Sequence, residues 1–395
     1  MSARSTGKEI IGYFVQWGVA QHGYSAKNIV SSGSADRLTV INYAFANIGE
    51  DLRCAIRDPL ADYGRAFDAG ESVDGIADAA DQPLRGNFEQ LRKLKHLYPH
   101  LKVLISIGGW TDSHCFSDAA LPENRDAFVR SCVDVFIRGN FGPGVSGPAI
   151  FDGIDVDWEY PAVIGHGHNV YRPEDTRNFT LLLAEFRRQL DAIDPNLMLT
   201  IAAPAPERCY SKIELGEIHQ YLDWINLMTY DFHGSWEMTT NHHSSLYSSP
   251  SDPTGGMSSD AAVQAFLAAG VPADKLVLGV PFYGRGWAGV PKANNGLYQL
   301  ASGFPQGPRA QNTGYRSLKK RGMAGFWDEV AHATWLYDGD EFWTLDDETS
   351  MAHKTGYVND QGLAGVMFWE LCGDDDGGSL IAAIDDGLHR PRTSA

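Results

Sequence analysis

The sequence has little positive charge and no long apolar run. Its 32 Lys and Arg residues face 50 Asp and Glu residues, which gives a formal net charge of -18. This balance argues against charge-driven binding to nucleic acid or to an anionic membrane and favours a neutral substrate. No stretch reaches the roughly 18 apolar residues of a membrane span. The opening residues, MSARSTGKEI, contain no apolar segment of signal-peptide length, so no signal peptide is predicted in the chain.

Cysteine is also scarce, with five residues that show neither CxxC spacing nor a dense framework. They are Cys54, Cys115, Cys132, Cys209 and Cys372. The spacing predicts neither a zinc cluster nor a disulfide scaffold, and the odd number leaves at least one thiol unpaired within the chain. Which pairs, if any, are bridged depends on geometry and stays open at this stage.

Eight short runs rich in β-branched and aromatic residues alternate with helical patterns. The helical patterns open on Asn87, Asn124, Asp175 and Ser259, residue types suited to a helix N-cap. Several of the runs are apolar through most of their length, as parallel strands buried on both faces are. This alternation predicts an α/β fold, a (β/α)8 TIM barrel, with a doubly wound open sheet as the alternative. The predicted strands are 9–17, 37–48, 101–110, 151–160, 197–205, 224–232, 276–285 and 363–371.

The seventh and eighth predicted strands are separated by residues 286–362, far more than an ordinary barrel connection. The first part of this segment, 286–347, is rich in Gly, Trp and Tyr. We therefore predict a small α+β insertion domain over 286–347. The catalytic barrel would comprise 1–285 and 348–395.

The fourth predicted strand, FDGIDVDWEYP (151–161), is unusually acidic. Side chains alternate along a strand, so Asp155, Asp157 and Glu159 share one face, and the opposite face is apolar. Neighbours on that face lie about 6–7 Å apart, and their coupled charges are expected to keep at least one proton bound near neutral pH. This arrangement predicts a general acid.

Metal binding is the main alternative for these residues. A calcium loop requires glycine at its sixth position, where this segment has Tyr. The histidines of GHGH (165–168) and NHH (241–243) lie in predicted loops without zinc spacing, and His233 is interpreted as a loop anchor or a partner of a site residue. No metal and no cofactor are predicted.

Aromatic and acidic residues recur at the carboxyl ends of the predicted strands, where the active site of such a barrel lies. Aromatic rings stack on the apolar faces of sugars while polar groups hold hydroxyls and amides. The pattern therefore indicates a sugar-binding cleft. The residues are Trp17, Trp110, Glu159, Tyr160, Tyr230, Asp231, Tyr283, Arg285, Trp369 and Glu370.

The acidic strand, read from Asp152 to Glu159, resembles the DxxDxDxE motif of family 18 glycoside hydrolases, the chitinases. SIGGW (106–110), MTYDFHG (228–234), PFYGR (281–285) and MFWE (367–370) resemble supporting motifs of that family at the third, sixth, seventh and eighth strands. The predicted insertion resembles that of the deep-cleft bacterial and fungal chitinases. The resemblance covers essentially the whole barrel.

The resemblance implies a role for each catalytic residue. Glu159 would protonate the glycosidic oxygen and later activate water. Asp157 would hold and polarise the N-acetyl group of the sugar, and Asp155 would share a proton with Asp157. Tyr230 would hydrogen-bond the acetamido carbonyl.

The remaining residues would bind substrate or support the strand. Asp152 would support the start of the acidic strand, and Ser106 would hydrogen-bond the inner aspartate. The substrate-binding set implied by the resemblance is Tyr13, Phe45, Trp110, Met228, Asp231, Trp236, Arg285 and Trp369.

The expected activity is retaining hydrolysis of β-1,4-linked N-acetylglucosamine polymers and oligomers through an oxazolinium intermediate. The alternatives are a non-hydrolytic chitin-binding lectin and an endo-β-N-acetylglucosaminidase acting on N-glycans. Chitin and chitooligosaccharides are the expected partners, without nucleic acid or membrane, and a monomer is expected. An extracellular location is inferred from the substrate alone.

Overall fold

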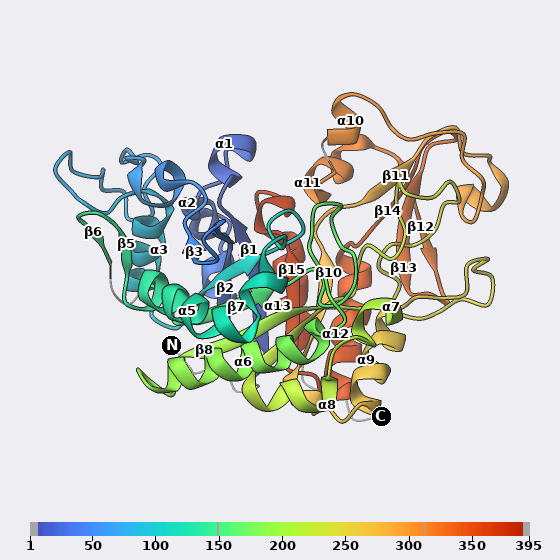
Figure 1. Ribbon diagram of the computed structural model, residues 1–395. Helices are drawn as coiled ribbons and strands as arrows, with labels where there is room; N and C mark the ends of the chain where they lie inside the picture. Colours follow the sequence, from blue (N-terminus) through green and yellow to red (C-terminus); the bar gives the residue numbers. More distant parts are fainter. Residues whose placement is uncertain (1–6, 148–149, 312, 390–395) are drawn as a thin grey trace.

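A closed barrel of eight parallel strands forms the body of the protein in the computed structural model, which describes residues 7–147, 150–311 and 313–389 (Figure 1). Pairing of β1 with both β15 and β2 closes the sheet, so the predicted (β/α)8 barrel is confirmed and the open sheet is excluded. The strands are β1 (Glu9–Val15), β2 (Val40–Ile48), β4 (Lys102–Gly108), β7 (Gly153–Asp157), β8 (Met198–Pro204), β9 (Trp224–Met228), β10 (Leu276–Pro281) and β15 (Gly365–Trp369).

Helices surround the barrel and bury their apolar faces against it. In α6 (Asp175–Asp191), for example, Leu182, Leu183, Phe186 and Leu190 recur at helical spacing and are buried. The other helices outside residues 286–347 are α1 (Gly18–His22), α2 (Ala26–Ser31), α3 (Gly86–Leu97), α4 (Phe116–Ala119), α5 (Pro122–Cys132), α7 (Glu207–Tyr210), α8 (Leu215–Ile218), α9 (Ser259–Ala268), α12 (Glu348–Gln361) and α13 (Ser379–His389).

The predicted helix N-caps were wrong in detail. Asn87 lies inside the first turn of α3, where its buried side-chain amide donates to Gln16 O and Tyr43 Oη instead of capping. Tertiary contacts thus use a side chain that local propensity would place at the cap. Helix α9 begins at Ser259 as predicted, but its cap is one residue earlier, since the Ser258 side chain accepts from the backbone N–H of Ala261.

The excursion between β10 and β15 contains an antiparallel sheet, drawn in orange to the right of the barrel in Figure 1. Its strands run in the order β11 (Arg285–Trp287), β14 (Phe342–Leu345), β13 (Ala333–Tyr337) and β12 (Ala324–Asp328), with the short helices α10 (Pro308–Gln311) and α11 (Tyr315–Leu318) in the same excursion. Trp287, Trp335, Tyr337 and Phe342 form part of a second buried apolar cluster there. The division at 285/286 and 347/348 stays a prediction.

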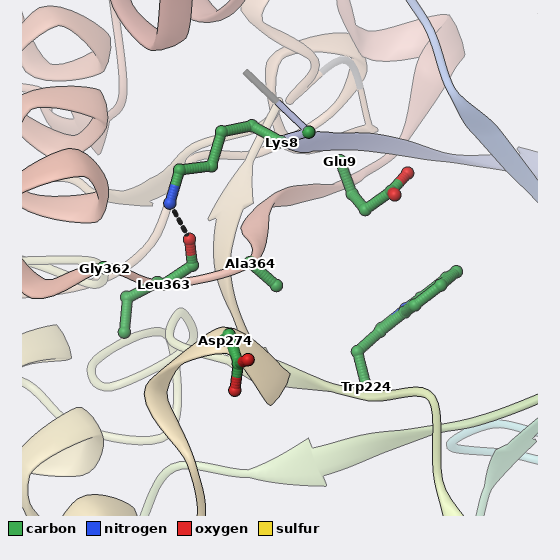
Figure 2. A pocket seen from close by; sticks show the side chains of 8 residues that line it. Lys8, Glu9, Trp224, Asp274, Gly362, Leu363 and Ala364 are labelled. Atoms are coloured by element: carbon green, nitrogen blue, oxygen red, sulfur yellow. Dashed lines mark hydrogen bonds between the residues drawn. The ribbon is translucent and has the colours of Figure 1, made fainter. Parts of the chain in front are cut away.

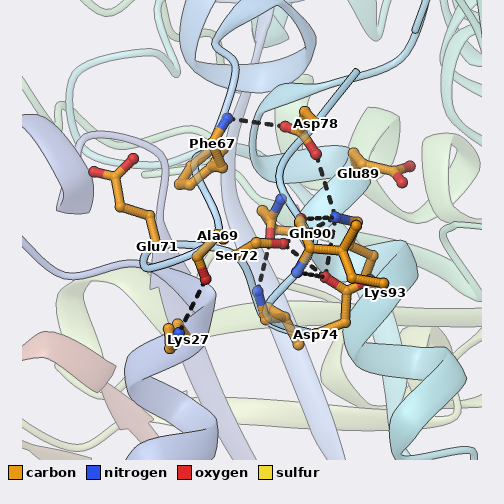
Figure 3. Close-up of polar contacts among 12 residues, drawn as sticks. Lys27, Phe67, Ala69, Glu71, Ser72, Asp74, Asp78, Glu89, Gln90 and Lys93 are labelled. Atoms are coloured by element: carbon orange, nitrogen blue, oxygen red, sulfur yellow. Dashed lines mark hydrogen bonds and ion pairs between the residues drawn. The ribbon is translucent and has the colours of Figure 1, made fainter.

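The long connection after β2 is anchored to α3 by a partly buried lysine (Figure 3). Lys93 Nζ donates to Ser72 Oγ (2.8 Å) and to the backbone oxygen of Ile76 (2.9 Å), and it pairs with Asp74 (3.1 Å) and Asp78 (3.3 Å). This cage of oxygens compensates the buried charge. It fixes residues 72–78 on the barrel wall.

Three short strands are additional to the eight parallel barrel strands and the β11–β14 sheet. Strand β3 (Cys54–Ala55) pairs with β2, and β5 (Asn140–Gly142) pairs with β6 (Val145–Ser146). All five cysteines are free thiols, which settles the pairing that the sequence left open. Within the described residues, no helix has both the length and the apolarity needed to cross a membrane.

A cavity of about 280 Å³ opens at the amino ends of the barrel strands (Figure 2). It is lined by Lys8, Glu9, Trp224 and Asp274, with the backbone of residues 362–364, and Lys8 donates to the Leu363 carbonyl. This cavity lies at the end of the barrel opposite to the carboxyl ends of the strands. It is therefore distinct from the site described below.

Candidate active site

The acidic row lies at the carboxyl end of β7, partly beyond the strand. β7 ends at Asp157, and Glu159 follows in the turn. Trp158 points away from the row and is 2 % exposed, stacked on Phe116 with ring centroids 5.3 Å apart. The alternation expected from the sequence therefore continues past the last strand residue and separates the acids from the apolar packing.

Close approach of the neighbouring strand fixes the backbone of this turn. A Cβ at Gly108 would lie 2.3 Å from the Asp157 carbonyl oxygen, so only glycine fits there, and Gly109 N donates to that same oxygen. The buried Ser113 hydroxyl also donates to Asp157 O (3.1 Å) and accepts from Glu159 N (3.0 Å). Gly108 of SIGGW is thus explained by its contact with the acidic turn, and Gly109 by the ring of Phe45, which a Cβ would meet at 2.7 Å.

Asp155 lies inside the barrel and is fully buried. Its Oδ2 accepts from Tyr13 Oη (2.8 Å) and Ser106 Oγ (2.8 Å). Its Oδ1 accepts from Thr200 Oγ1 (2.6 Å) and Asn226 Nδ2 (3.3 Å). Burial raises the pKa of Asp155, while these four donors act in the opposite direction by stabilising the carboxylate.

Asp157 has the opposite environment. It is 4 % exposed, and its buried Oδ1 has no hydrogen-bond partner among the described residues. Burial and the neighbouring carboxylates Glu159 and Asp155 raise the pKa of Asp157 well above its ordinary value. Asp155 thus has four donors that favour its charged form, whereas Asp157 Oδ1 has none.

Glu159 is 8 % exposed at the end of the row. Burial, helped by the charge of Asp231, raises the pKa of Glu159 to about 7, although a hydrogen bond from Tyr160 works against the rise. A carboxyl group with this pKa is substantially protonated at neutral pH. It can therefore donate a proton to a leaving group and take one back from water.

Asp231 and Arg285 hold each other in a two-pronged ion pair. Arg285 Nε and Nη2 donate to the two carboxylate oxygens of Asp231 at 2.8 and 2.6 Å. Although burial opposes it, contact with His243 and Arg285 lowers the pKa of Asp231, so this carboxylate stays charged. The guanidinium also lies over the rings of Trp236 (5.4 Å) and Tyr283 (5.2 Å).

Tyr230 lies half-buried beside these groups. Its hydroxyl is 3.8 Å from the Met367 sulfur, a weak acceptor. Burial and the surrounding carboxylates, Asp157 first among them, raise the pKa of Tyr230 well above its ordinary value. The phenol therefore keeps its proton and is available as a hydrogen-bond donor.

Aromatic rings from three strand ends meet around Trp369. Its ring stacks on Phe45 with centroids 5.6 Å apart, and Tyr13 (5.4 Å) and Trp17 (6.3 Å) lie against it. Non-proline cis peptide bonds occur at Ala44–Phe45, Glu159–Tyr160 and Trp369–Glu370. Tyr13 is only 1 % exposed and gives its hydroxyl to Asp155, so it lies beneath this wall and backs the site from inside the barrel.

The other predicted sugar platforms are exposed. Trp110 and Trp236 are 50 % and 59 % exposed, and Trp110 meets His166 edge to face at 6.0 Å. Met228 ends β9 and is half-buried against the core. Large aromatic surfaces left open to water are unusual unless they bind something.

Asp152 ties the start of β7 to its neighbours and stands apart from the acidic row. Its carboxylate accepts from Val103 N (2.9 Å) and pairs with Lys95 (2.7 Å). Sequence reasoning missed Thr200, Asn226 and Ser113. Thr200 and Asn226 are lone polar residues in the apolar strands 197–205 and 224–232, a pattern that could have indicated side chains pointing into the barrel.

Two of the histidines singled out in the sequence contact carboxylates. His233 contacts Glu237 (2.7 Å), and His242 contacts Asp328 (3.3 Å). Within the part of the chain that the structure describes, none of the histidines of GHGH or NHH belongs to a group of three potential metal ligands.

Comparisons with known proteins agree with this geometry. The family model "Glycosyl hydrolases family 18" matches residues 9–374. The chain belongs to family 18 of the glycosyl hydrolases. It is 39 % identical to "Chitinase 63" of Streptomyces plicatus over 96 % of this chain, and 40 % identical to "Chitinase C" of Streptomyces lividans over 94 %. It spans 60 % and 58 % of the lengths of those two relatives.

A solved structure is similar over almost its entire length. It is described as the catalytic domain of psychrophilic chitinase B from Arthrobacter TAD20, with a TM-score of 0.92 and 38 % identity. The match covers 97 % of this family 18 chain and 96 % of that one. The residues matched by the family model, 9–374, contain all eight barrel strands and the excursion between β10 and β15.

Proposed function

We propose that this family 18 protein hydrolyses β-1,4-linked N-acetylglucosamine chains, chitin and its oligomers, with retention of configuration. The observation that carries the proposal is the contrast between two adjacent acids. Asp155 has four donors, whereas Asp157 Oδ1 is buried without a partner beside the protonated Glu159. A buried polar atom needs a partner, and we assign that partner to the bound substrate. The N–H of a 2-acetamido group supplies one.

In the first step, the acetamido carbonyl oxygen attacks the anomeric carbon of the sugar bound over Trp369. The electron pair of the breaking C1–O bond passes to the glycosidic oxygen, which takes the proton of Glu159. Tyr230 donates to the acetamido oxygen and orients it. Asp157 passes its proton to Asp155, turns to the acetamido nitrogen and, as a carboxylate, accepts its N–H and stabilises the positive charge of the oxazolinium ring.

In the second step, water attacks C1 while the Glu159 carboxylate accepts its proton. The C1–O bond to the acetamido oxygen breaks, and the amide is restored. Two inversions at C1 give net retention. A protein carboxylate nucleophile would stand about 5–5.5 Å from the acid across the sugar. Asp231 is a poor candidate for that role, because both of its oxygens accept from Arg285.

Replacing Asp157 with Asn is expected to lower kcat by about 10²-fold, the size typical for loss of one electrostatic stabiliser of a transition state. The amide keeps the shape but cannot become a carboxylate facing the oxazolinium nitrogen. Steady-state hydrolysis of a soluble chitin oligomer measures this loss. Asp152→Asn, a change at the start of the same strand, should leave kcat within a few-fold of wild type, and equal losses in both variants would contradict the assigned role.

The pH profile should show an alkaline limb set by Glu159. Because the first step needs this carboxyl protonated and its pKa is about 7, kcat/KM should fall about tenfold per pH unit above that value. Replacing Asp231 with Asn should move the limb to lower pH, since the Asp231 charge helps to raise the pKa of Glu159. A wild-type profile that stays flat two units above pH 7 would contradict the assignment.

Substrate class separates the proposal from its alternatives. We propose chitin over N-glycans because exposed Trp110 and Trp236 flank the acids, as a chain of sugars requires. Incubation with chitin hexamer should release short oligomers, whereas a high-mannose glycan should stay uncut. Release of the glycan instead would favour an endo-β-N-acetylglucosaminidase. Saturable binding of the hexamer without any cleavage would indicate a lectin.

The proposed chemistry needs neither a metal nor a cofactor, because substrate and side chains supply the nucleophile, the acid and the charge. Polymeric chitin cannot enter a cell, so we place the activity outside it.

A further inference from the structure

A histidine, a glutamate and a cysteine converge at the edge of the aromatic wall, outside the proposed catalytic groups. They are His22 at the end of α1, Glu370 directly after β15 and Cys372 in the short helix Leu371–Gly373. One potential ligand atom from each lies within 4.8 Å of the others. Among the described residues, this is the group of three His, Cys, Asp or Glu side chains whose potential ligand atoms lie this close together.

The carboxylate in this cluster is incompletely satisfied. Glu370 Oε1 accepts from the Cys372 thiol at 2.9 Å, but Oε2 is buried and has no partner in the described structure. A buried carboxylate oxygen without a donor is costly and requires an explanation. A bound cation would supply one.

The exposure of the three residues differs in the way an accessible metal site requires. Cys372 is 7 % exposed and Glu370 is partly buried, whereas His22 is exposed to solvent. The nearby guanidinium of Arg316 is paired with Asp376, which offsets its repulsion of a cation. An ion could thus enter past His22 and meet the two inner ligands.

From this geometry we propose that His22, Glu370 and Cys372 bind a thiophilic divalent cation of the Zn²⁺ class. Imidazole nitrogen, carboxylate oxygen and thiolate sulfur are the ligand types of zinc sites, at about 2.0–2.3 Å from the metal. Tetrahedral ligands at those distances lie about 3.3–3.8 Å apart, so the present cluster needs to adjust by only about 1 Å. Binding releases the Cys372 thiol proton to solvent, and water completes the fourth position.

The position of the cluster gives the ion a structural role at the cleft. Helix α1 follows Trp17, and Glu370 follows Trp369, and the rings of these two tryptophans lie 6.3 Å apart. A metal shared by His22 and Glu370 links the two segments that carry the rings. It would stabilise the aromatic wall from behind, independently of the hydrolytic chemistry.

The test is cobalt and zinc binding by the untagged chain of residues 1–395. Co²⁺ should produce a thiolate-to-cobalt charge-transfer band in the near ultraviolet at one equivalent per chain. Zn²⁺ should displace Co²⁺ and raise the thermal unfolding midpoint. Cys372→Ser should abolish the band and weaken Zn²⁺ binding by at least about 10²-fold, since even changes around a metal ligand typically cost about 10–100-fold.

Two further variants keep the proposal falsifiable if Cys372→Ser folds poorly. His22→Ala alters an exposed residue and should weaken Zn²⁺ binding while preserving the fold. Cys115→Ser is the matched control, because Cys115 is also a partly buried thiol near carboxylates, Asp118 and Glu50. It should leave the band unchanged. Absence of the band in wild type, its persistence in Cys372→Ser or its loss in Cys115→Ser would overturn the proposal.

Discussion

Replacing Glu159 with Gln should reduce kcat on chitin hexamer by about 10³–10⁴-fold, the upper range for loss of a general acid–base group. The same carboxyl acts in both proposed steps, first as acid and then as base, and an amide can do neither. KM should change little, because Gln preserves the shape and the neutral charge of the protonated acid. Steady-state kinetics together with calorimetric binding of the hexamer separate the two effects.

The control for this substitution is Glu89→Gln on α3. Glu89 is 2 % exposed, comparable in burial to Glu159, but it pairs with Arg92 on the outside of the barrel. This variant should keep wild-type kcat even if it loses some stability. Glu159→Gln should unfold at nearly the wild-type temperature. A Glu159→Gln enzyme that retains more than a tenth of wild-type kcat would refute its role as the acid.

Removing the substrate's own nucleophile should be as damaging as removing the acid. The test substrate is a hexamer that lacks the N-acetyl group on the sugar at the non-reducing side of the scissile bond. The enzyme should cut it at least about 10³-fold more slowly than the fully acetylated hexamer, because a well-placed intramolecular nucleophile is worth an effective concentration of about 10⁵ M or more. Without the acetamido oxygen there is no attack at C1. Asp157 also loses its charged partner.

A graded series sharpens this test. Fluorination of the acetyl methyl withdraws electrons from the carbonyl oxygen and should lower the rate progressively with each fluorine. An oligomer de-N-acetylated only on the reducing side of the scissile bond keeps the nucleophile. Its cleavage rate should stay within about tenfold of the rate for the fully acetylated oligomer, because only binding contacts are lost. Equal rates for the two singly deacetylated substrates would exclude substrate assistance.

The sequence carried much of the fold because each strand of the barrel is a local pattern. Alternation placed Asp155 and Asp157 opposite Trp158, and the apolar strands required burial on both faces. The eight predicted runs contain all eight barrel strands. The end of β7 at Asp157 was not predictable from the sequence. The turn is shaped by the close contact of Asp157 with Gly108, and these two residues lie far apart in the chain.

Other features depend on barrel closure and could not be found by scanning the chain. Thr200 and Asn226 reach Asp155 from the next two strands, and the distance between them in sequence conceals this contact. His22 and Cys372 lie near opposite ends of the chain and meet because β1 pairs with β15. Asn87 was misread as a cap because its tertiary partners, Gln16 and Tyr43, also lie far from it in sequence.

The most direct test of the central claim is a proton NMR time course of chitin hexamer cleavage that follows the anomeric signals before mutarotation. Substrate-assisted hydrolysis with Glu159 as acid and base predicts that the new reducing ends appear first as the β-anomer and equilibrate later. Initial formation of the α-anomer would mean direct attack by water with inversion. That result would contradict the account, however active the enzyme proved to be.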